Sequence, residues 1–300
     1  MVAFYVGLAA WGVSRLERVA ALSGRADTAG TTWLLVGSDS REGLTAEQRR
    51  TLKTGLFEGR RTDTVILLHA PAGGGKPTLV SLPRDSYVEI PGRGRSKLNA
   101  AFSLGGPPLL VETVEQATGL TIDSYVEVGF GGVVGVVDGA GGVEICVDKA
   151  IQDEKSGLDV RAGCQKMDGA TALSYVRARY FDPTGDLGRI RRQQQFLGSL
   201  VDRVFGPAVM FNPVRQAHLV AASTEAVVVD DDTGPIDLGR LAWTFRKVTG
   251  GDGLLTTVPV ADPDYRPGGV GSTVLWDEDA AAALFAELEA GRPVSERNAQ

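Results

Sequence analysis

Short apolar runs alternate along the chain with segments whose apolar residues recur at helical spacing. The apolar runs predict strands at 32–36, 64–70, 78–82, 143–147 and 254–260. The run at 64–70 is too apolar for a half-exposed strand, so we expect it at the centre of a sheet. The segment 122–128 alternates between apolar and polar residues, which predicts a half-buried strand.

Helical spacing and helix-end signals predict the elements between these strands. Pro107 and Pro108 open a helix that ends at Gly119, and Asp168 caps another. A long half-buried helix is expected from residue 185. Further helices are expected at 44–56, 129–135, 213–224, 236–249 and 277–291. Since no linker or repeat interrupts 31–290, we predict a single α/β domain with a mixed central sheet, followed by a disordered tail at 291–300.

The first residues of the chain are apolar for about a dozen positions, fewer than the roughly 20 that span a bilayer. Arg15 and Arg18 follow this stretch. We interpret residues 1–30 as the outer end of a membrane anchor with a juxtamembrane helix. A free amphipathic helix packed on the domain is an equal alternative.

Composition and charge narrow the class of protein. With 43% hydrophobic and 23% charged residues among 300, the chain matches an ordinary globular protein. The net charge of -6 argues against general nucleic-acid binding, which needs a basic surface. Residues 225–300 carry 6 basic and 14 acidic side chains, so 25 of the 31 basic ones precede them. We therefore expect an anion site in residues 1–224.

Several familiar motifs do not fit the sequence. In the glycine loop 71–77 a proline stands where the Ser or Thr of a P-loop follows the lysine, and 129–135 lacks the dinucleotide-binding spacing. His69 ends an apolar run and is expected in the core. With His218 as the only other histidine, a His-rich zinc site is excluded. A hydrolase built on a serine of 37–41 lacks the G-x-S-x-G elbow.

Three clusters of charged and polar residues follow or interrupt predicted strands, where α/β proteins place ligands. The first holds Asp39, Arg41, Arg60, Arg61 and Asp63; the second Arg84, Asp85, Lys97 and Asn99; the third Arg177, Arg179, Asp182, Asp186, Arg189, Arg191, Arg192 and Gln193.

These clusters have a phosphate-binding and a structural interpretation. Arg177 and Arg179 share a face only if their segment is extended, and the two guanidinium groups then need an anion between them. Separate salt bridges to acids of the same segment are the alternative. Asp39 and Asp63, flanked by arginines, suit a magnesium-bridged diphosphate, but they also suit ordinary caps.

The chain resembles the LytR-CpsA-Psr family of cell-wall glycopolymer ligases in five motifs that occur in the family's order. They are GSDSR (37–41), RTDTVIL (61–67), SLPRDSYV (81–88), KLNAAFSLGG (97–106) and VRARYFDPTGDLGRIRRQQQF (176–196). The resemblance implies a mixed-sheet α/β domain with helices on the sheet and a hydrophobic tunnel for a lipid. It also implies one N-terminal membrane helix and a catalytic domain outside the cell. The Ala, Val and Arg content is typical of a high-GC actinobacterium.

The resemblance also implies the roles of individual residues. Asp39 and Asp63 would bind Mg²⁺, or Mn²⁺ in its place. The diphosphate would be bound by Arg61, Arg84, Lys97, Arg177, Arg179, Arg189 and Gln193. Arg61, Arg84, Arg177 and Arg179 would act in catalysis together with Asp186. Asp85 and Asn99 would support the site.

The reaction implied is attack of a peptidoglycan hydroxyl, the 6-OH of N-acetylmuramic acid, on the sugar-proximal phosphorus of a polyprenyl-diphosphate-linked glycan. Lipid phosphate leaves and a phosphodiester forms. Asp186 or Asp39 would accept the hydroxyl proton. A pyrophosphatase acting on the same lipid and a regulator that binds polyprenyl phosphates without turnover remain alternatives.

Two features of this chain add to the family pattern. The 42–60 insertion is longer than in many members and is expected to form a lid or a partner surface. Cys146 and Cys164 alone fit either an extracytoplasmic disulfide or two unrelated core thiols. In a family that faces outward, a disulfide across this separation of 18 would contribute about 3 kcal/mol.

Overall fold

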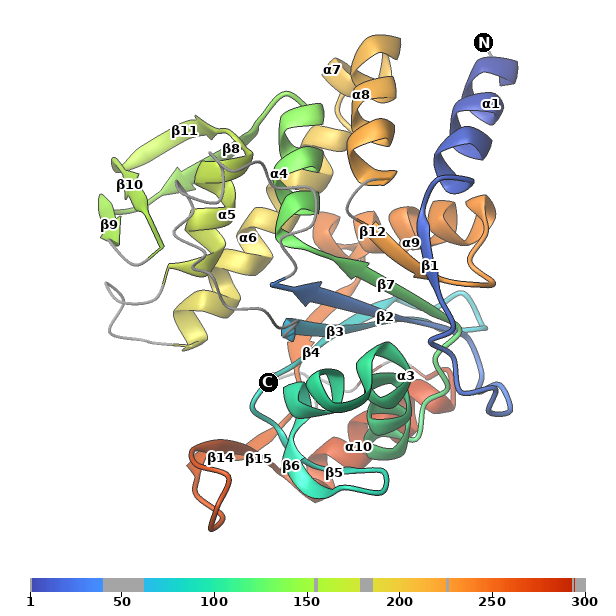
Figure 1. Cartoon of the computed structure of the whole chain (residues 1–300), viewed down its shortest axis with the longest axis vertical. Coiled ribbons are helices and arrows are strands. Elements are labelled where there is room, and N and C mark those ends of the chain that lie inside the picture. The colour runs from blue at the N-terminus through green and yellow to red at the C-terminus, as the bar shows by residue number, and fades with distance from the viewer. Residues whose placement is uncertain are drawn as a thin grey trace. The chain divides into compact units, whose positions relative to one another are not determined.

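The computed structural model describes residues 2–39, 62–153, 156–178, 186–224, 227–292 and 294, with the backbone alone at 2–6, 9, 186–191 and 223 (Figure 1). Its backbone contacts divide the chain into two compact units. Unit 1 comprises residues 1–17, 40–58 and 129–227, and unit 2 comprises 18–39, 59–128 and 228–300. The domain boundaries predicted at 30 and 290 stay a prediction.

Unit 2 is built on a seven-stranded sheet with the order β1-β12-β7-β2-β3-β4-β13. The strands are β1 Glu17–Val19, β2 Thr31–Ser38, β3 Thr62–Ala70, β4 Thr78–Leu82, β7 Ser124–Val128, β12 Val227–Asp230 and β13 Leu254–Thr257. β3 is antiparallel to β2 and β4, whereas β2 is parallel to β7 and β4 to β13. The sheet is therefore mixed, and the prediction of β3 as an interior strand is confirmed.

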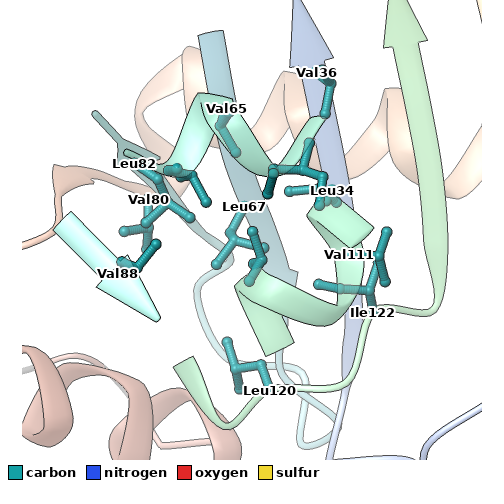
Figure 2. Packing of buried hydrophobic residues seen from close by; sticks show 14 of the residues in the cluster. Leu34, Val36, Val65, Leu67, Val80, Leu82, Val88, Val111, Leu120 and Ile122 are labelled. Carbon is teal, nitrogen blue, oxygen red and sulfur yellow. The ribbon is translucent and has the colours of Figure 1, made fainter. Parts of the chain in front are cut away.

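Helices cover both faces of this sheet. α3 Leu98–Thr118 and α10 Glu278–Glu289 lie on one side, and α9 Pro235–Lys247, followed by the π-helix η1 Val248–Asp252, lies on the other (Figure 1). Figure 2 shows Leu34, Leu67 and Val80, from three neighbouring strands, packed in one cluster with Val111 of α3. The predicted α/β fold with a mixed central sheet is thus confirmed, while the hydrophobic tunnel stays a prediction.

The helix predicted from Pro107 to Gly119 is the second part of α3. Gly119 adopts a left-handed φ of 78° and donates its N–H to Glu115, so the helix ends as predicted. Gly106, with φ 66°, separates this part from an earlier helical part that begins at Leu98 and was not predicted. Two hairpins were also not predicted: β5 Tyr87–Ile90 with β6 Gly94–Lys97, and β14 Val260–Tyr265 with β15 Thr273–Trp276.

Unit 1 consists of helices and two small antiparallel sheets. Its elements are α1 Val2–Val13, α4 Phe130–Gly139, β8 Val143–Val147, β9 Ile151–Asp153, β10 Leu158–Val160, β11 Gly163–Met167, α5 Gly169–Arg177, α6 Asp186–Val204, α7 Pro207–Met210 and α8 Pro213–Thr224. A Cβ on Gly169 would lie 2.4 Å from the Val134 oxygen, so α5 packs directly on α4. The glycine-rich 129–135 segment is therefore a close-packed helix, as predicted.

Three local predictions differ from the structure. β7 is buried at four of its five residues and does not alternate, because it lies inside the sheet with β2 and β12 beside it. α1 ends at Val13, and 17–19 forms a strand where a juxtamembrane helix is expected. Arg177, expected in an extended segment, is the last residue of α5. The Ala178 N–H still donates to the Ser174 oxygen, and extended backbone begins only at Ala178.

Candidate active site

Asp39 and Asp63, the predicted metal ligands, flank one residue pair of the central sheet. Ser38 at the end of β2 pairs with Thr62 at the start of β3, after a register shift between Gly37 and Ser38. Asp39 follows Ser38 and Asp63 follows Thr62, so both acids belong to this end of the strand pair. β-Bulges re-aim side chains and are frequent beside active sites.

The hydroxyl groups of Ser38 and Thr62 are buried at this bulge. The two residues are 1% and 0% exposed, and within the described residues neither hydroxyl oxygen has a hydrogen-bond partner. A buried hydroxyl without a partner costs free energy, and native structures normally satisfy it with protein, water or a ligand. The bulge therefore offers two polar atoms for a ligand or a bound water.

The second predicted cluster forms a row of alternating charges. The Arg84 guanidinium, just after β4, pairs with the Asp63 carboxylate. Its Nε also donates to Asp85 Oδ2 at 3.3 Å, and Lys97 Nζ donates to Asp85 Oδ1 at 2.9 Å. The four side chains are 22 to 36% exposed. The structure thus brings Asp63, Arg84, Asp85 and Lys97 together, as the sequence analysis expects.

The electrostatics of this row keep Arg84 and Asp85 ionised. Burial alone would raise the pKa of Asp85, but the hydrogen bond from Lys97 and the charges of Arg84 and Lys97 outweigh it, so the pKa lies below its ordinary value. Burial alone would lower the pKa of Arg84, but the charges of Asp63 and Asp85 raise it. Both guanidinium and carboxylate therefore stay charged at neutral pH.

The start of α3 fixes the turn that carries Arg84 and Asp85. Asn99 donates its backbone N–H to the Arg84 oxygen at 2.9 Å, and Leu98 donates to the Ser86 oxygen at 2.9 Å. The Ser86 hydroxyl accepts a hydrogen bond from Trp276 Nε1 at 2.8 Å. Asn99, predicted to support the site, thus contacts this turn through its backbone N–H.

The third cluster lies in unit 1. The Arg177 guanidinium lies 4.9 Å from the centre of the Phe130 ring, and Gln193 is half-buried on α6. Arg192 is 7% exposed, and its Nη2 donates to the Ala178 oxygen at 2.7 Å. This contact holds the chain at the point where the arginine-rich segment leaves α5.

Other predicted residues fall partly or wholly outside the described part of the chain. Arg61 and Arg179 lie outside it, as do the 42–60 insertion and the helix predicted at 44–56. Asp186 and Arg189 are described by their backbone alone, in the first turns of α6. Arg189 and Gln193 are four residues apart on that helix, which puts them on one face.

The predicted disulfide is present. Cys146 and Cys164 are register partners on β8 and β11 and form a disulfide bond. Gln195 of α6 donates to the Cys146 oxygen at 2.7 Å and accepts from the Tyr175 hydroxyl at 2.6 Å. One glutamine therefore links α5 and α6 to the strand that carries the disulfide.

The described residues fit a magnesium ion only together with a phosphate ligand. None of their groups of three or more His, Cys, Asp or Glu side chains is placed to hold a metal ion. Mg²⁺ commonly takes one or two protein carboxylates and completes its coordination with phosphate oxygens and water. Asp39 and Asp63 match that donor set, and the unpartnered hydroxyls of Ser38 and Thr62 add polar atoms beside them.

Sequence reasoning missed the buried hydroxyls and Gln195, and it placed Arg192 in the third cluster without predicting that this side chain is buried. Ser38 and Thr62 carry no sequence signal, because their importance lies in burial and in a bulge that only the strand pairing reveals. Gln195 and Arg192 stand in the arginine-rich motif, where helical spacing alone does not show which side chains turn inward. Because Arg192 is buried and bound to the Ala178 oxygen, its role in the structure is to hold the backbone at that position.

Solved structures share this fold. A LytR-Csp2A-Psr enzyme from Actinomyces oris aligns with a TM-score of 0.69 at 22% identity, covering 92% of this chain and 96% of that one. A structure described as TagT bound to LI-WTA aligns with a TM-score of 0.65 at 23% identity, covering 92% and 98%. Such identities establish a common fold alone.

Sequence relatives are closer. The probable cell wall biosynthesis protein LcpB of Corynebacterium glutamicum is 46% identical over 283 residues, which cover 93% of this chain and 66% of the relative. LcpA of the same organism is 34% identical over 295 residues, covering 88% and 56%. A relative from Enterococcus faecalis, named as a polyisoprenyl-teichoic acid–peptidoglycan teichoic acid transferase, is 36% identical over 197 residues, covering 65% and 63%.

The matched region therefore spans only 66% and 56% of the two Corynebacterium relatives. The LytR_cpsA_psr family model matches residues 12–238, well over half of the 300 residues. This match contains all five sequence motifs on which the resemblance rests. The chain belongs to the LytR-CpsA-Psr family.

Proposed function

We propose that the chain is a phosphotransferase that moves a glycopolymer from a polyprenyl diphosphate carrier to peptidoglycan. The observation that carries this proposal is the row of charges Asp63, Arg84, Asp85 and Lys97. Beside it lie two buried hydroxyls that have no partner among the described residues. At one end of the strands β2, β3 and β4, this row supplies cations that can bind a diphosphate. It also supplies carboxylates that can bind the diphosphate's metal counter-ion. The names of the relatives as cell-wall biosynthesis proteins and teichoic acid transferases support the substrate class.

In the proposed reaction the 6-OH of N-acetylmuramic acid loses its proton and forms an O–P bond to the sugar-proximal phosphorus. The bridging P–O bond breaks, and polyprenyl phosphate leaves with the electron pair. Arg84 and Lys97 bind phosphate oxygens, and Asp85 keeps both cations oriented. The family resemblance supports further diphosphate-binding roles for Arg61, Arg177, Arg179, Arg189 and Gln193, and a proton-accepting role for Asp186 or Asp39.

Asp39 and Asp63 are the residues that would hold Mg²⁺, which when bound would supply positive charge to the phosphate oxygens. Preorganised positive charge of this kind is the main source of catalysis in phosphoryl transfer. The hydroxyls of Ser38 and Thr62 would donate to a phosphate oxygen or to a water beside the carboxylates. We place the enzyme at the outer face of the cell membrane, where both substrates meet.

The test follows release of polyprenyl phosphate from a synthetic polyprenyl-diphosphate disaccharide, with and without peptidoglycan oligomers. Release that depends on the acceptor supports the transferase. Equal release without acceptor would show the pyrophosphatase, and binding without release would show a regulator. Arg84→Ala should slow release by about 100- to 1000-fold, whereas Arg95→Ala, which changes an exposed arginine of the same unit, should leave it unchanged.

A further inference from the structure

Residues 207–214 of unit 1, here named the apolar tip, comprise α7, the two residues that link it to α8 and the first two residues of α8. They expose large apolar side chains. Phe211 is 84% exposed, Val214 62% and Met210 46%. Between Arg203 and Arg215 the chain contains no charged residue. Soluble monomers rarely expose such a contiguous apolar patch without a binding role. The apolar tip is therefore a candidate interaction surface.

A second uncharged element lies beside the apolar tip. α1 contains no charged residue and packs along α8, where a Cβ on Gly12 would lie 2.5 Å from Val220 Cγ1. The two helices run in the same direction (Figure 1). Gly12 and Val220 stand ten and seven residues after the first residues of their helices, so the two helix starts lie within about 5 Å of each other along the axis. The beginning of α1 and the apolar tip thus share one end of unit 1.

The apolar tip offers few side-chain hydrogen-bonding groups to a protein partner. Asn212 is its only polar residue, and Asn212 Oδ1 already accepts from the backbone N–H groups of Val214 and Arg215, each at 3.1 Å. Two arginines flank the apolar tip in the sequence, and both contact the turn that follows α4. Arg203 donates to the Ala140 oxygen at 3.0 Å, and the Arg215 guanidinium lies beside Gly141. Apolar side chains backed by arginines match the layering of an anionic bilayer surface.

We propose that the apolar tip inserts into the lipid bilayer next to α1, giving unit 1 a second membrane contact. Phe211 and Val214 enter the boundary between headgroups and acyl chains, and Arg203 and Arg215 lie at the level of the phosphates. This contact rests on the proposed location of the chain at the membrane, but not on the proposed chemistry, because it uses no residue of the candidate active site.

The test places an environment-sensitive fluorophore on the apolar tip of the 300-residue chain. Both native cysteines form the disulfide, so Phe211→Cys and Val214→Cys can each be labelled selectively. Ile236→Cys is the matched control, because Ile236 is an equally exposed apolar residue, at 70%, on α9 of unit 2. Each labelled protein is mixed with vesicles of phosphatidylcholine and phosphatidylglycerol in equal parts.

With vesicles, emission from positions 211 and 214 should shift to shorter wavelength and be quenched by nitroxide lipids, while emission from position 236 changes little. The same response at all three positions, or none at 211 and 214, would overturn the proposal. A shift without vesicles that grows with protein concentration would also overturn it, since it would show self-association. Having two labelled positions guards against the misfolding of one variant.

Discussion

The Asp85 carboxylate accepts a hydrogen bond from Lys97 Nζ at 2.9 Å and one from Arg84 Nε at 3.3 Å, so one acid holds two cations of the candidate site. These contacts keep the pKa of Asp85 below its ordinary value of 3.8 although burial opposes them. Their contribution to stability is therefore present above about pH 4 and is lost as pH falls through the folded-state pKa.

The variant Lys97→Met should move this loss to higher pH. Without the ammonium, burial raises the pKa of Asp85, and the free energy of unfolding at neutral pH should fall by about 1 kcal/mol. Urea unfolding measured from pH 7 to pH 3 checks the shift. Lys76→Met, at an exposed lysine of the same unit, is the control, and identical pH profiles for both variants would contradict the account.

Arg84→Ala should lower the rate of transfer by about 100- to 1000-fold, the usual cost of removing one preorganised donor from a transition state. Arg84→Lys should recover only part of that rate, because an ammonium cannot contact Asp63 and Asp85 through a planar fork. Steady-state kinetics with saturating donor measure both effects. A lysine variant as fast as the wild type would contradict the account, because it would show that charge alone explains the role of Arg84.

Thr62→Val should separate ligand binding from stability. Because the Thr62 hydroxyl has no partner among the described residues, its replacement by a methyl group should leave the melting temperature unchanged or higher. Binding of a diphosphate donor in Mg²⁺ should weaken by about 1 kcal/mol, or roughly fivefold, in calorimetric titration.

The control for this experiment is Thr118→Val in α3. The Thr118 hydroxyl donates to the Val114 oxygen at 2.8 Å, so its loss should lower the melting temperature and leave donor binding unchanged. If Thr62→Val instead destabilises the protein without affecting the donor, the hydroxyl serves an internal water and not the ligand.

His69 should make folding sensitive to mild acid. Burial lowers the pKa of His69 to about 4 from 6.5, while its Nδ1 lies 3.0 Å from the Thr32 hydroxyl. The unfolded chain takes up a proton near pH 6.5 and the folded chain only near pH 4, so stability falls as pH drops between these values. The fall from this group is about 3 kcal/mol. His69→Gln should flatten the profile of unfolding free energy against pH in this interval, and an unchanged slope would refute the assignment.

Reduction of the disulfide between Cys146 and Cys164 should destabilise unit 1 by about 3 kcal/mol, because the bond closes a loop across a sequence separation of 18. The denaturation midpoint with and without reductant measures this loss. A double Cys→Ser variant should match the reduced protein and be insensitive to reductant. Equal midpoints for the oxidised and reduced wild type would contradict the prediction.

The sequence patterns predict the interior of the sheet and the helix ends well, because both depend on local signals. Apolar continuity identifies β3, and Gly119 and Asp168 end or cap helices as expected. The alternating pattern of 122–128 predicts a half-buried strand, in which the glutamate of β7 would face solvent. That residue, Glu127, is buried and accepts a hydrogen bond from the Tyr125 hydroxyl, a pairing that only the folded sheet creates.

Sequence motifs predict some residues of the candidate site, whereas others become evident only in the structure. Motif order indicates Asp63, Arg84, Asp85 and Lys97, and the structure brings them into one row of ion pairs. The pairing of Ser38 with Thr62 depends on a register shift, so no local pattern announces it. The expected extended pair of Arg177 and Arg179 fails for Arg177, because α5 continues through it.

The most direct test of the account is the mass of the product formed from a polyprenyl-diphosphate disaccharide, Mg²⁺ and peptidoglycan oligomers. The account predicts muramic acid that carries the disaccharide through a single phosphate, formed by the wild type and lost in Asp63→Asn. Free disaccharide phosphate as the only product, or a linked product without phosphorus, would contradict it.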